Sequence, residues 1–154
     1  METLLFGGVK MLKKRLGVEA IERNWWFSTL PSCYKIPSSL IIPEGCRIVG
    51  DHAFSGCREL KKVVFPESLE EIGIGAFICT NIEEVRFFGS KIYKYAFRSC
   101  EKLERVILSD KTKEIEGWVF LDCREARITI NRPEYDPPYI GTDAFWGCKE
   151  VRYV

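Results

Sequence analysis

The chain has 154 residues, a length that fits one domain. Hydrophobic residues make up 46% and charged residues 29%, which excludes a disordered chain and a membrane-spanning protein. The net charge of +1 argues against a strongly basic nucleic-acid binder. No window holds the roughly 18 apolar residues of a membrane span, and the N-terminus lacks a secretory signal pattern. We therefore expect a cytoplasmic protein.

Residues 1–37 do not share the pattern of the rest of the chain. Apolar residues recur there near helical spacing, which predicts helix, and Gly17 is a point at which it divides into two short helices. The apolar residues are Val9, Leu12, Leu16, Ala20 and Ile21. With the aromatic run at 25–27, this segment is predicted to be a helical, aromatic N-terminal cap. A basic amphipathic membrane helix is the alternative, weakened by Glu19 and Glu22.

From residue 38 onward, one short pattern recurs five times. Each copy has a phenylalanine anchor after a small or medium residue, and an aliphatic residue five positions before the anchor. The anchors are Phe54, Phe77, Phe97, Phe120 and Phe145, at intervals of 23, 20, 23 and 25 residues. The aliphatic residues are Val49, Ile72, Ile92, Ile115 and Ile140. Intervals of this size are typical of solenoid repeats.

A strand-like run of alternating apolar residues follows each anchor. The runs are residues 60–66, 82–88, 103–109, 126–131 and 151–154, and a half-copy at 39–45 supplies an earlier strand. One such unit cannot bury its apolar side alone, whereas stacked units cover one another. The sequence therefore predicts a mainly β repeat solenoid over residues 38–154, with parallel strands about 4.8 Å apart.

Seven cysteines are present, and five of them follow the anchors: Cys57, Cys79, Cys100, Cys123 and Cys148. The spacing is three residues except at Cys79, where the repeat is interpreted as one residue shorter. Cysteine here is expected to act as a small buried hydrophobe with a weak S–H donor. There is no CxxC pair and only one histidine, so no metal site is predicted, and all seven thiols are expected to be free.

The pattern L-x-x-V-x-F-P followed by I-G-x-x-A-F-x-x-C resembles the BspA-like leucine-rich repeat family. Residues 60–66 with 72–79, and 103–108 with 115–123, carry the resemblance best, and it covers about residues 39–154. It implies a leucine-rich-repeat stack of parallel strands that acts as a general interaction scaffold. Family members are often secreted or surface-bound; the missing export signal weakens any carry-over of adhesion to this chain.

The exposed face of the strands is the main candidate binding site. One outward column is predicted to hold Lys62, Glu84, Arg105 and Arg127, and the next holds Val64, Arg86, Ile107 and Thr129, preceded by Ile41. Arginine and apolar residues with few acids suit a protein interface. Four basic residues give only a modest electrostatic attraction for nucleic acid, which is the weaker interpretation. An ordinary solvated strand surface is the third.

The last run is a second candidate. Residues Val151, Arg152, Tyr153 and Val154 are expected to form an uncapped C-terminal edge. A terminal repeat without a polar cap leaves unpaired backbone groups and apolar surface. Three interpretations are open for this edge: the short strand is tolerated as it is, it pairs with a second copy to form a homo-oligomer, or it docks another protein.

No constellation for catalysis is found. His52 is the single histidine, and its equivalents in the other repeats are Gly75, Tyr95, Trp118 and Asp143, which indicates an outer turn. We therefore predict a non-catalytic protein–protein interaction module without a cofactor. The alternatives are a structural protomer of an assembly, and a small intracellular inhibitor or effector encoded by a phage or pathogen. The partner's identity lies in residues that the repeat leaves free.

Overall fold

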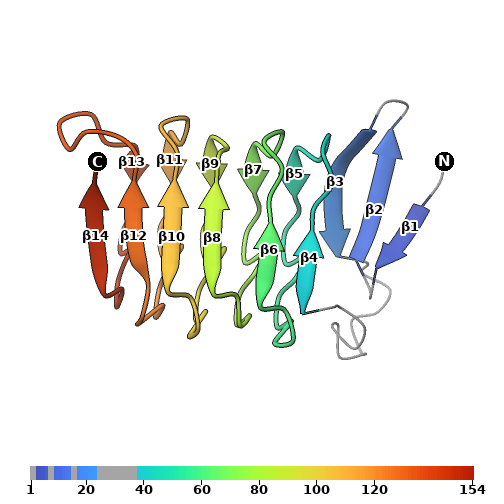
Figure 1. Cartoon of the computed structure of the whole chain (residues 1–154), viewed down its shortest axis with the longest axis horizontal. Coiled ribbons are helices and arrows are strands. Elements are labelled where there is room, and N and C mark those ends of the chain that lie inside the picture. The colour runs from blue at the N-terminus through green and yellow to red at the C-terminus, as the bar shows by residue number, and fades with distance from the viewer. Residues whose placement is uncertain (1–2, 7–8, 15–16, 24–37) are drawn as a thin grey trace.

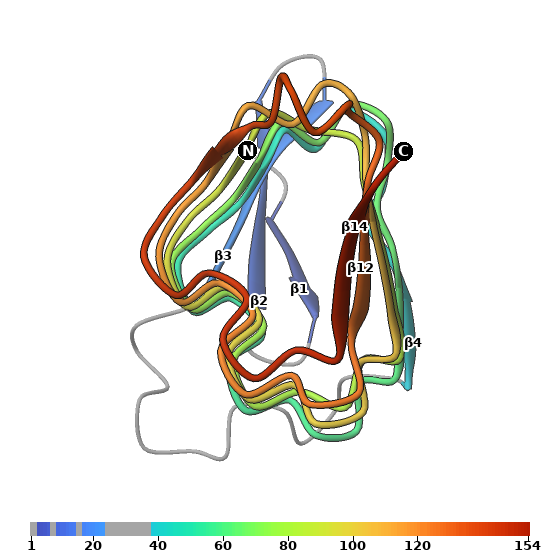
Figure 2. The same ribbon diagram turned by 90° about the vertical axis from the view of Figure 1, so that its left-hand side faces the viewer.

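The computed structural model describes residues 3–6, 9–14, 17–23 and 38–154 of the chain. The chain winds into a rod of stacked coils with two parallel walls (Figure 1). Viewed along the rod, successive coils superimpose, with β4, β12 and β14 in one wall and β3 on the opposite side (Figure 2). The repeat solenoid predicted from the sequence is confirmed.

One wall is a six-stranded sheet in the order β14-β12-β10-β8-β6-β4, and all of its pairings are parallel. Its strands are β4 (Ser39–Ile41), β6 (Lys62–Val64), β8 (Glu84–Phe87), β10 (Arg105–Leu108), β12 (Arg127–Ile130) and β14 (Glu150–Tyr153). Each lies within one of the runs of alternating apolar residues, except that β14 begins one residue before its run. Val63, Val85, Val106 and Ile128 point inward from these strands and are buried. Burial of one face fixes the register, because a slip by one residue would turn the charged column inward.

The other wall is an eight-stranded sheet in the order β1-β2-β3-β5-β7-β9-β11-β13. Five strands of two residues each belong to the repeats: β5 (Ile48–Val49), β7 (Glu71–Ile72), β9 (Lys91–Ile92), β11 (Glu114–Ile115) and β13 (Tyr139–Ile140). The second residue of each strand is one of the aliphatic residues noted in the sequence. All of these aliphatic residues are buried except Ile140, which is partly exposed in the last coil.

The helix predicted near the N-terminus is not found in the residues that the structure describes there. They form three strands, β1 (Thr3–Phe6), β2 (Val9–Lys14) and β3 (Gly17–Arg23), which pair in antiparallel order. β3 then pairs in parallel with β5. A strand at this position satisfies backbone groups at the edge of the sheet that a helix would leave unpaired, which favours strands here. The aromatic run at 25–27 lies outside the described residues.

The phenylalanine anchors form a stacked column through the core. The ring centroids of Phe54 and Phe77 are 5.1 Å apart. The centroid of Phe97 is 5.3 Å from that of Phe77 and 5.3 Å from that of Phe120. The column ends at Phe145, 5.9 Å from Phe120. Offset stacking adds to the burial of apolar area, so this column holds successive coils together. The predicted role of the phenylalanines is confirmed.

The cysteine column needs a correction at the second repeat. Thr80, rather than Cys79, follows Phe77 by three residues, and its Oγ1 lies 3.3 Å from the Cys100 Sγ. The second repeat is therefore not shortened at this point, and threonine replaces cysteine in the column. Cys79 instead occupies a turn position with a φ of 57°.

The buried thiols donate hydrogen bonds to the coil before them. Cys100 Sγ donates to the Phe77 carbonyl at 3.1 Å, and Cys123 Sγ to the Phe97 carbonyl at 3.0 Å. Thr80 Oγ1 also donates, but to the Phe77 carbonyl of its own coil, at 2.9 Å, so a small side chain with one donor fits this column. Burial raises the pKa of Cys46 to about 11 and that of Cys148 to about 12, so these thiols stay protonated at neutral pH.

The expectation of seven free thiols is wrong for Cys57. Five cysteines are free in the described part of the chain: Cys46, Cys79, Cys100, Cys123 and Cys148. Cys57 is disulfide-bonded. Spacing along the chain gives no sign of this bond, because Cys57 follows its anchor by the same three residues as Cys100, Cys123 and Cys148, which are free.

Candidate strand-face site

The outward residues of the six-stranded sheet form two columns in register. Lys62 pairs with Glu84, Glu84 with Arg105, and Arg105 with Arg127. In the second column Ile41 pairs with Val64, Arg86 with Ile107, and Ile107 with Thr129. The structure thus brings together the eight residues singled out in the sequence. We call the outward surface of β4, β6, β8, β10, β12 and β14 the strand face.

The strand face extends further than the sequence predicted. Glu150 pairs with Arg127 and Arg152 with Thr129, so both columns continue onto β14. Phe88 is 38% exposed just after β8. Arg152 was predicted only as part of the C-terminal edge. Phe88 continues the outward alternation of Glu84 and Arg86, and it was missed because the two predicted columns stopped at Arg86.

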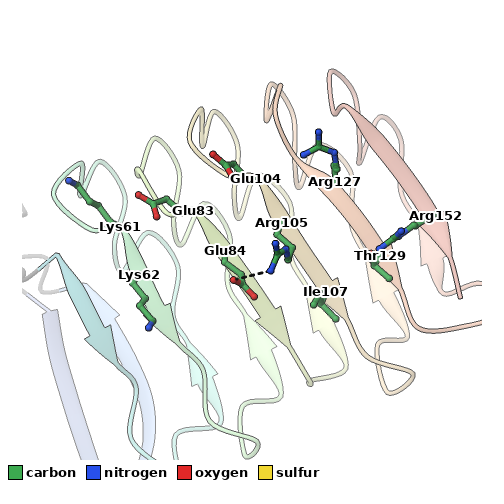
Figure 3. Close-up of a pocket in the computed structure, with 10 residues that line it drawn as sticks. All are labelled: Lys61, Lys62, Glu83, Glu84, Glu104, Arg105, Ile107, Arg127, Thr129 and Arg152. Carbon is green, nitrogen blue, oxygen red and sulfur yellow. Dashed lines mark hydrogen bonds and ion pairs between the residues drawn. The ribbon is translucent and has the colours of Figure 1, made fainter.

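Two adjoining hollows lie on this face. The larger has a volume of about 680 Å³ and the smaller about 330 Å³. The larger is drawn in Figure 3, and its lining residues are Lys61, Lys62, Glu83, Glu84, Glu104, Arg105, Ile107, Arg127, Thr129 and Arg152. Lys62 and Glu84 line both hollows, so the two adjoin on the strand face, and we call them together the trough.

Glu84 is the acidic centre of the trough. Arg86 Nε lies 2.6 Å from Glu84 Oε1, and Arg105 Nη1 lies 3.8 Å from Glu84 Oε2. Arg127 Nε is 4.0 Å from Glu150 Oε2, and Arg152 Nε donates a 3.0 Å hydrogen bond to Thr129 Oγ1. Exposed ion pairs of this kind add little stability, so these residues are free to vary without loss of the fold.

Exposed apolar side chains lie at the β4 and β6 end of the strand face, away from the arginines of β10 and β12. Ile41 is 72% exposed and Val64 is 42% exposed, and these two residues are neighbours in the sheet. Val64 and Phe88 both line the smaller hollow. The strand face therefore changes from apolar near β4 and β6 to arginine-rich near β10 and β12.

The outer surface of the other sheet differs, because its central charges are already paired. Lys91 Nζ lies 3.1 Å from Glu114 Oε2, 3.2 Å from Glu116 Oε1 and 4.3 Å from the centre of the Tyr93 ring. The hydrogen bond with Glu114 raises the pKa of Lys91, and Glu116 adds to it. A charge with this many partners stabilises the coil stack and leaves less to attract a ligand.

The residues predicted to form a C-terminal edge lie in and just after β14. β14 is the outermost strand of the six-stranded sheet. Val151, in the inward column, is 37% exposed, and Val154 is 66% exposed. Tyr153 packs partly against the core. The edge thus presents both apolar side chains and strand backbone.

His52 lies in an exposed turn, as expected. Its φ of 54° is matched by 58° at Gly75, 61° at Tyr95, 58° at Trp118 and 52° at Asp143, so this position of the turn is left-handed in all five coils. In the part of the chain that the structure describes, no group of three or more His, Cys, Asp or Glu side chains is placed to hold a metal ion. No helix among the described residues is long and apolar enough to cross a membrane.

A family model for the BspA type leucine rich repeat region matches residues 29–152 in six copies. The chain belongs to the BspA-type leucine-rich repeat family. The resemblance noted from the sequence is therefore confirmed. Leucine-rich repeat solenoids are commonly used for protein interaction and are generally non-catalytic.

Two solved structures are similar to this BspA-type chain. A leucine-rich repeat protein of T. pallidum shares 20% identity with a TM-score of 0.45, over 96% of this chain and 83% of that one. A leucine-rich repeat protein from Bacteroides ovatus shares 14% identity with a TM-score of 0.35, over 97% of this chain and 70% of that one. No curated protein matches the chain.

Proposed function

We propose that this BspA-type repeat is a non-catalytic protein-binding module and that the strand face is its binding surface. The observation that carries the proposal is the trough of two adjoining hollows on that face. Its outward residues do not contribute to the buried core, so the surface can suit a partner without a cost to folding. Arginine and exposed aliphatic and aromatic side chains are typical of protein interfaces.

The test is a charge reversal on the strand face. The chain would be used to capture proteins from a lysate of its host, beside the Arg105→Glu/Arg127→Glu variant. The matched control is Lys94→Glu/Lys113→Glu, which makes the same change in net charge at exposed residues next to β9 and β11. We expect binding to weaken at least tenfold in the first variant, since interface arginines often carry about 1–2 kcal/mol each, and to persist in the control.

If both variants retain the same proteins as the wild type, the strand face is not the binding surface. The site would then lie at the ends of the rod or on the outer surface of the other sheet. An activity assay on a captured partner would separate a scaffold from an inhibitor.

A second candidate function is assembly through β14. The exposed Val151 and the outermost position of β14 support it, because an unpaired strand edge can add a further strand. Sedimentation at rising protein concentration is expected to show a dimer that Val151→Lys abolishes. A mass that remains monomeric at every concentration would contradict this assembly.

A further inference from the structure

We infer that the strand face takes an acidic segment of a partner protein that also carries an apolar anchor residue. This inference rests on the proposed function and names the chemistry of the partner. It is drawn from the two ends of the trough, which differ in charge and in exposed apolar area.

The arginine end offers guanidinium groups that are weakly paired within the chain. Arg105 and Arg127 have side chains 64% and 54% exposed, and their ion pairs are long, at 3.8 and 4.0 Å. By contrast, Arg86 holds Glu84 at 2.6 Å. A guanidinium presents a planar fork of donors that matches a carboxylate in a two-point hydrogen-bonded pair. An incoming carboxylate can therefore form shorter contacts with Arg105 and Arg127 than their present partners do.

The apolar end offers a place for one hydrophobic side chain. The smaller hollow, about 330 Å³, is lined by Val64 and Phe88, and both are at least partly exposed to solvent. Burial of an apolar side chain there removes surface from water on both partners. Since Lys62 and Glu84 line both hollows, one extended segment can reach the apolar end and the arginine end together.

Carboxylates in the trough favour a protein segment over nucleic acid. Glu83, Glu84 and Glu104 line the larger hollow, between the basic residues. A nucleic acid carries a phosphate at every nucleotide and would place some of them against these carboxylates. A protein segment can carry acidic residues only opposite the arginines and a neutral or basic residue opposite the glutamates.

The test is a selection of short random peptides, displayed on phage, against the immobilised full-length chain. We expect the selected peptides to be enriched in Asp and Glu together with at least one large apolar residue, relative to the unselected library. Labelled peptides from this pool would then be measured by fluorescence anisotropy. The Arg105→Glu/Arg127→Glu variant should bind these peptides about tenfold more weakly or worse, whereas the Lys94→Glu/Lys113→Glu variant should bind them as the wild type does. A selection against Phe88→Ala should keep the acidic residues and lose the preference for the apolar one.

Three outcomes would overturn the inference: no enrichment at all, a pool without excess acid, or a labelled oligothymidine that binds more tightly than any selected peptide and in an arginine-dependent way. The binding of the selected peptides to the variants shows whether the proposed function fails together with this inference. A pool poor in acid that is still lost in Arg105→Glu/Arg127→Glu leaves the strand face as a protein-binding surface. Peptides that bind every variant equally count against both.

Discussion

Phe97 shows what one buried ring contributes to the stack of coils. Its side chain is fully buried, and its ring is nearly parallel to those of Phe77 and Phe120, at 3° in both cases. Phe145 has the same place in the last coil, but it is only partly buried and stacks on one ring alone. The two residues therefore form a matched pair that differs in the number of neighbouring coils.

We expect Phe97→Ala to lower the free energy of unfolding by about 3–5 kcal/mol, because it removes a buried ring and leaves a cavity between two coils. Phe145→Ala should cost less, about 1–2 kcal/mol, because its ring is already partly exposed. Urea denaturation followed by circular dichroism measures both. Equal costs for the two variants would contradict a stack whose stability depends on neighbouring coils.

The cysteine column shows where a reading by residue type fails. Counting positions from Phe77 leads to Thr80, whereas searching for the next cysteine leads to Cys79. The column holds a small side chain that donates to a backbone carbonyl. The Cys100 thiol donates to Phe77 of the coil before it, whereas the Thr80 hydroxyl donates to Phe77 of its own coil. The spacing therefore carries the structural information, and the identity of the residue carries less.

Among the structural elements, the corner between β8 and β9 is unusually tight. A Cβ added at Gly89 would lie 2.4 Å from the Leu69 carbonyl oxygen and 2.5 Å from that of Glu70. Glycine thus lets this corner pack directly against the backbone of the preceding coil. Such a tight corner contributes to the short interval of 20 residues between Phe77 and Phe97.

We expect Gly89→Ala to cost about 3 kcal/mol, because a methyl group there must push backbone aside in a packed stack. Gly56→Ala is the control, since no atom lies within 4 Å of a Cβ at Gly56. Its cost should be about 1 kcal/mol, which reflects only its φ of 74°. Thermal or urea unfolding of both variants makes the comparison; a Gly89→Ala protein as stable as Gly56→Ala would mean that the corner opens easily.

The repeat elements were predictable from sequence, whereas the N-terminal ones were not. In the repeats, alternation of apolar residues and a fixed interval from each anchor both point to the same strands, and register follows from the repeat itself. Residues 9–23 have no repeated partner, and their apolar spacing suits a helix. Their pairing with β5 depends on the free edge of a sheet built elsewhere in the chain, which is a tertiary effect that local spacing does not contain.

The candidate site was predictable to a similar extent. The column in which Arg105 or Thr129 lies follows from register alone. The distances between charged atoms, which matter for binding, do not follow from register, because they depend on the rotamers of the long side chains. Arg86 and Arg105 both reach the same carboxylate of Glu84, one along its own strand and one across the sheet, and sequence gives no order of strength between them.

At the scale of the whole molecule, each coil contacts only the coils beside it. β10 pairs with both β8 and β12, whereas β14 pairs with β12 alone. In such a stack the stability of a coil is close to the sum of its own contribution and those of its neighbouring interfaces. Stability should therefore differ along the rod even though the coils are alike in structure.

Amide hydrogen exchange is expected to show this difference directly. Amides of β8 and β10 should exchange only through global unfolding, whereas amides of the last coil should exchange through its local opening. An example is the Val154 N–H, just after β14, which donates to the Ile130 carbonyl at 3.0 Å. A hundredfold difference in protection, about 2.7 kcal/mol, is the expected scale for losing one coil interface. Exchange measured by mass spectrometry on peptides covering each strand would resolve it. Uniform protection from β6 to β14 would show instead that the rod opens as a single cooperative unit, and binding at the strand face would then stabilise all of its coils equally.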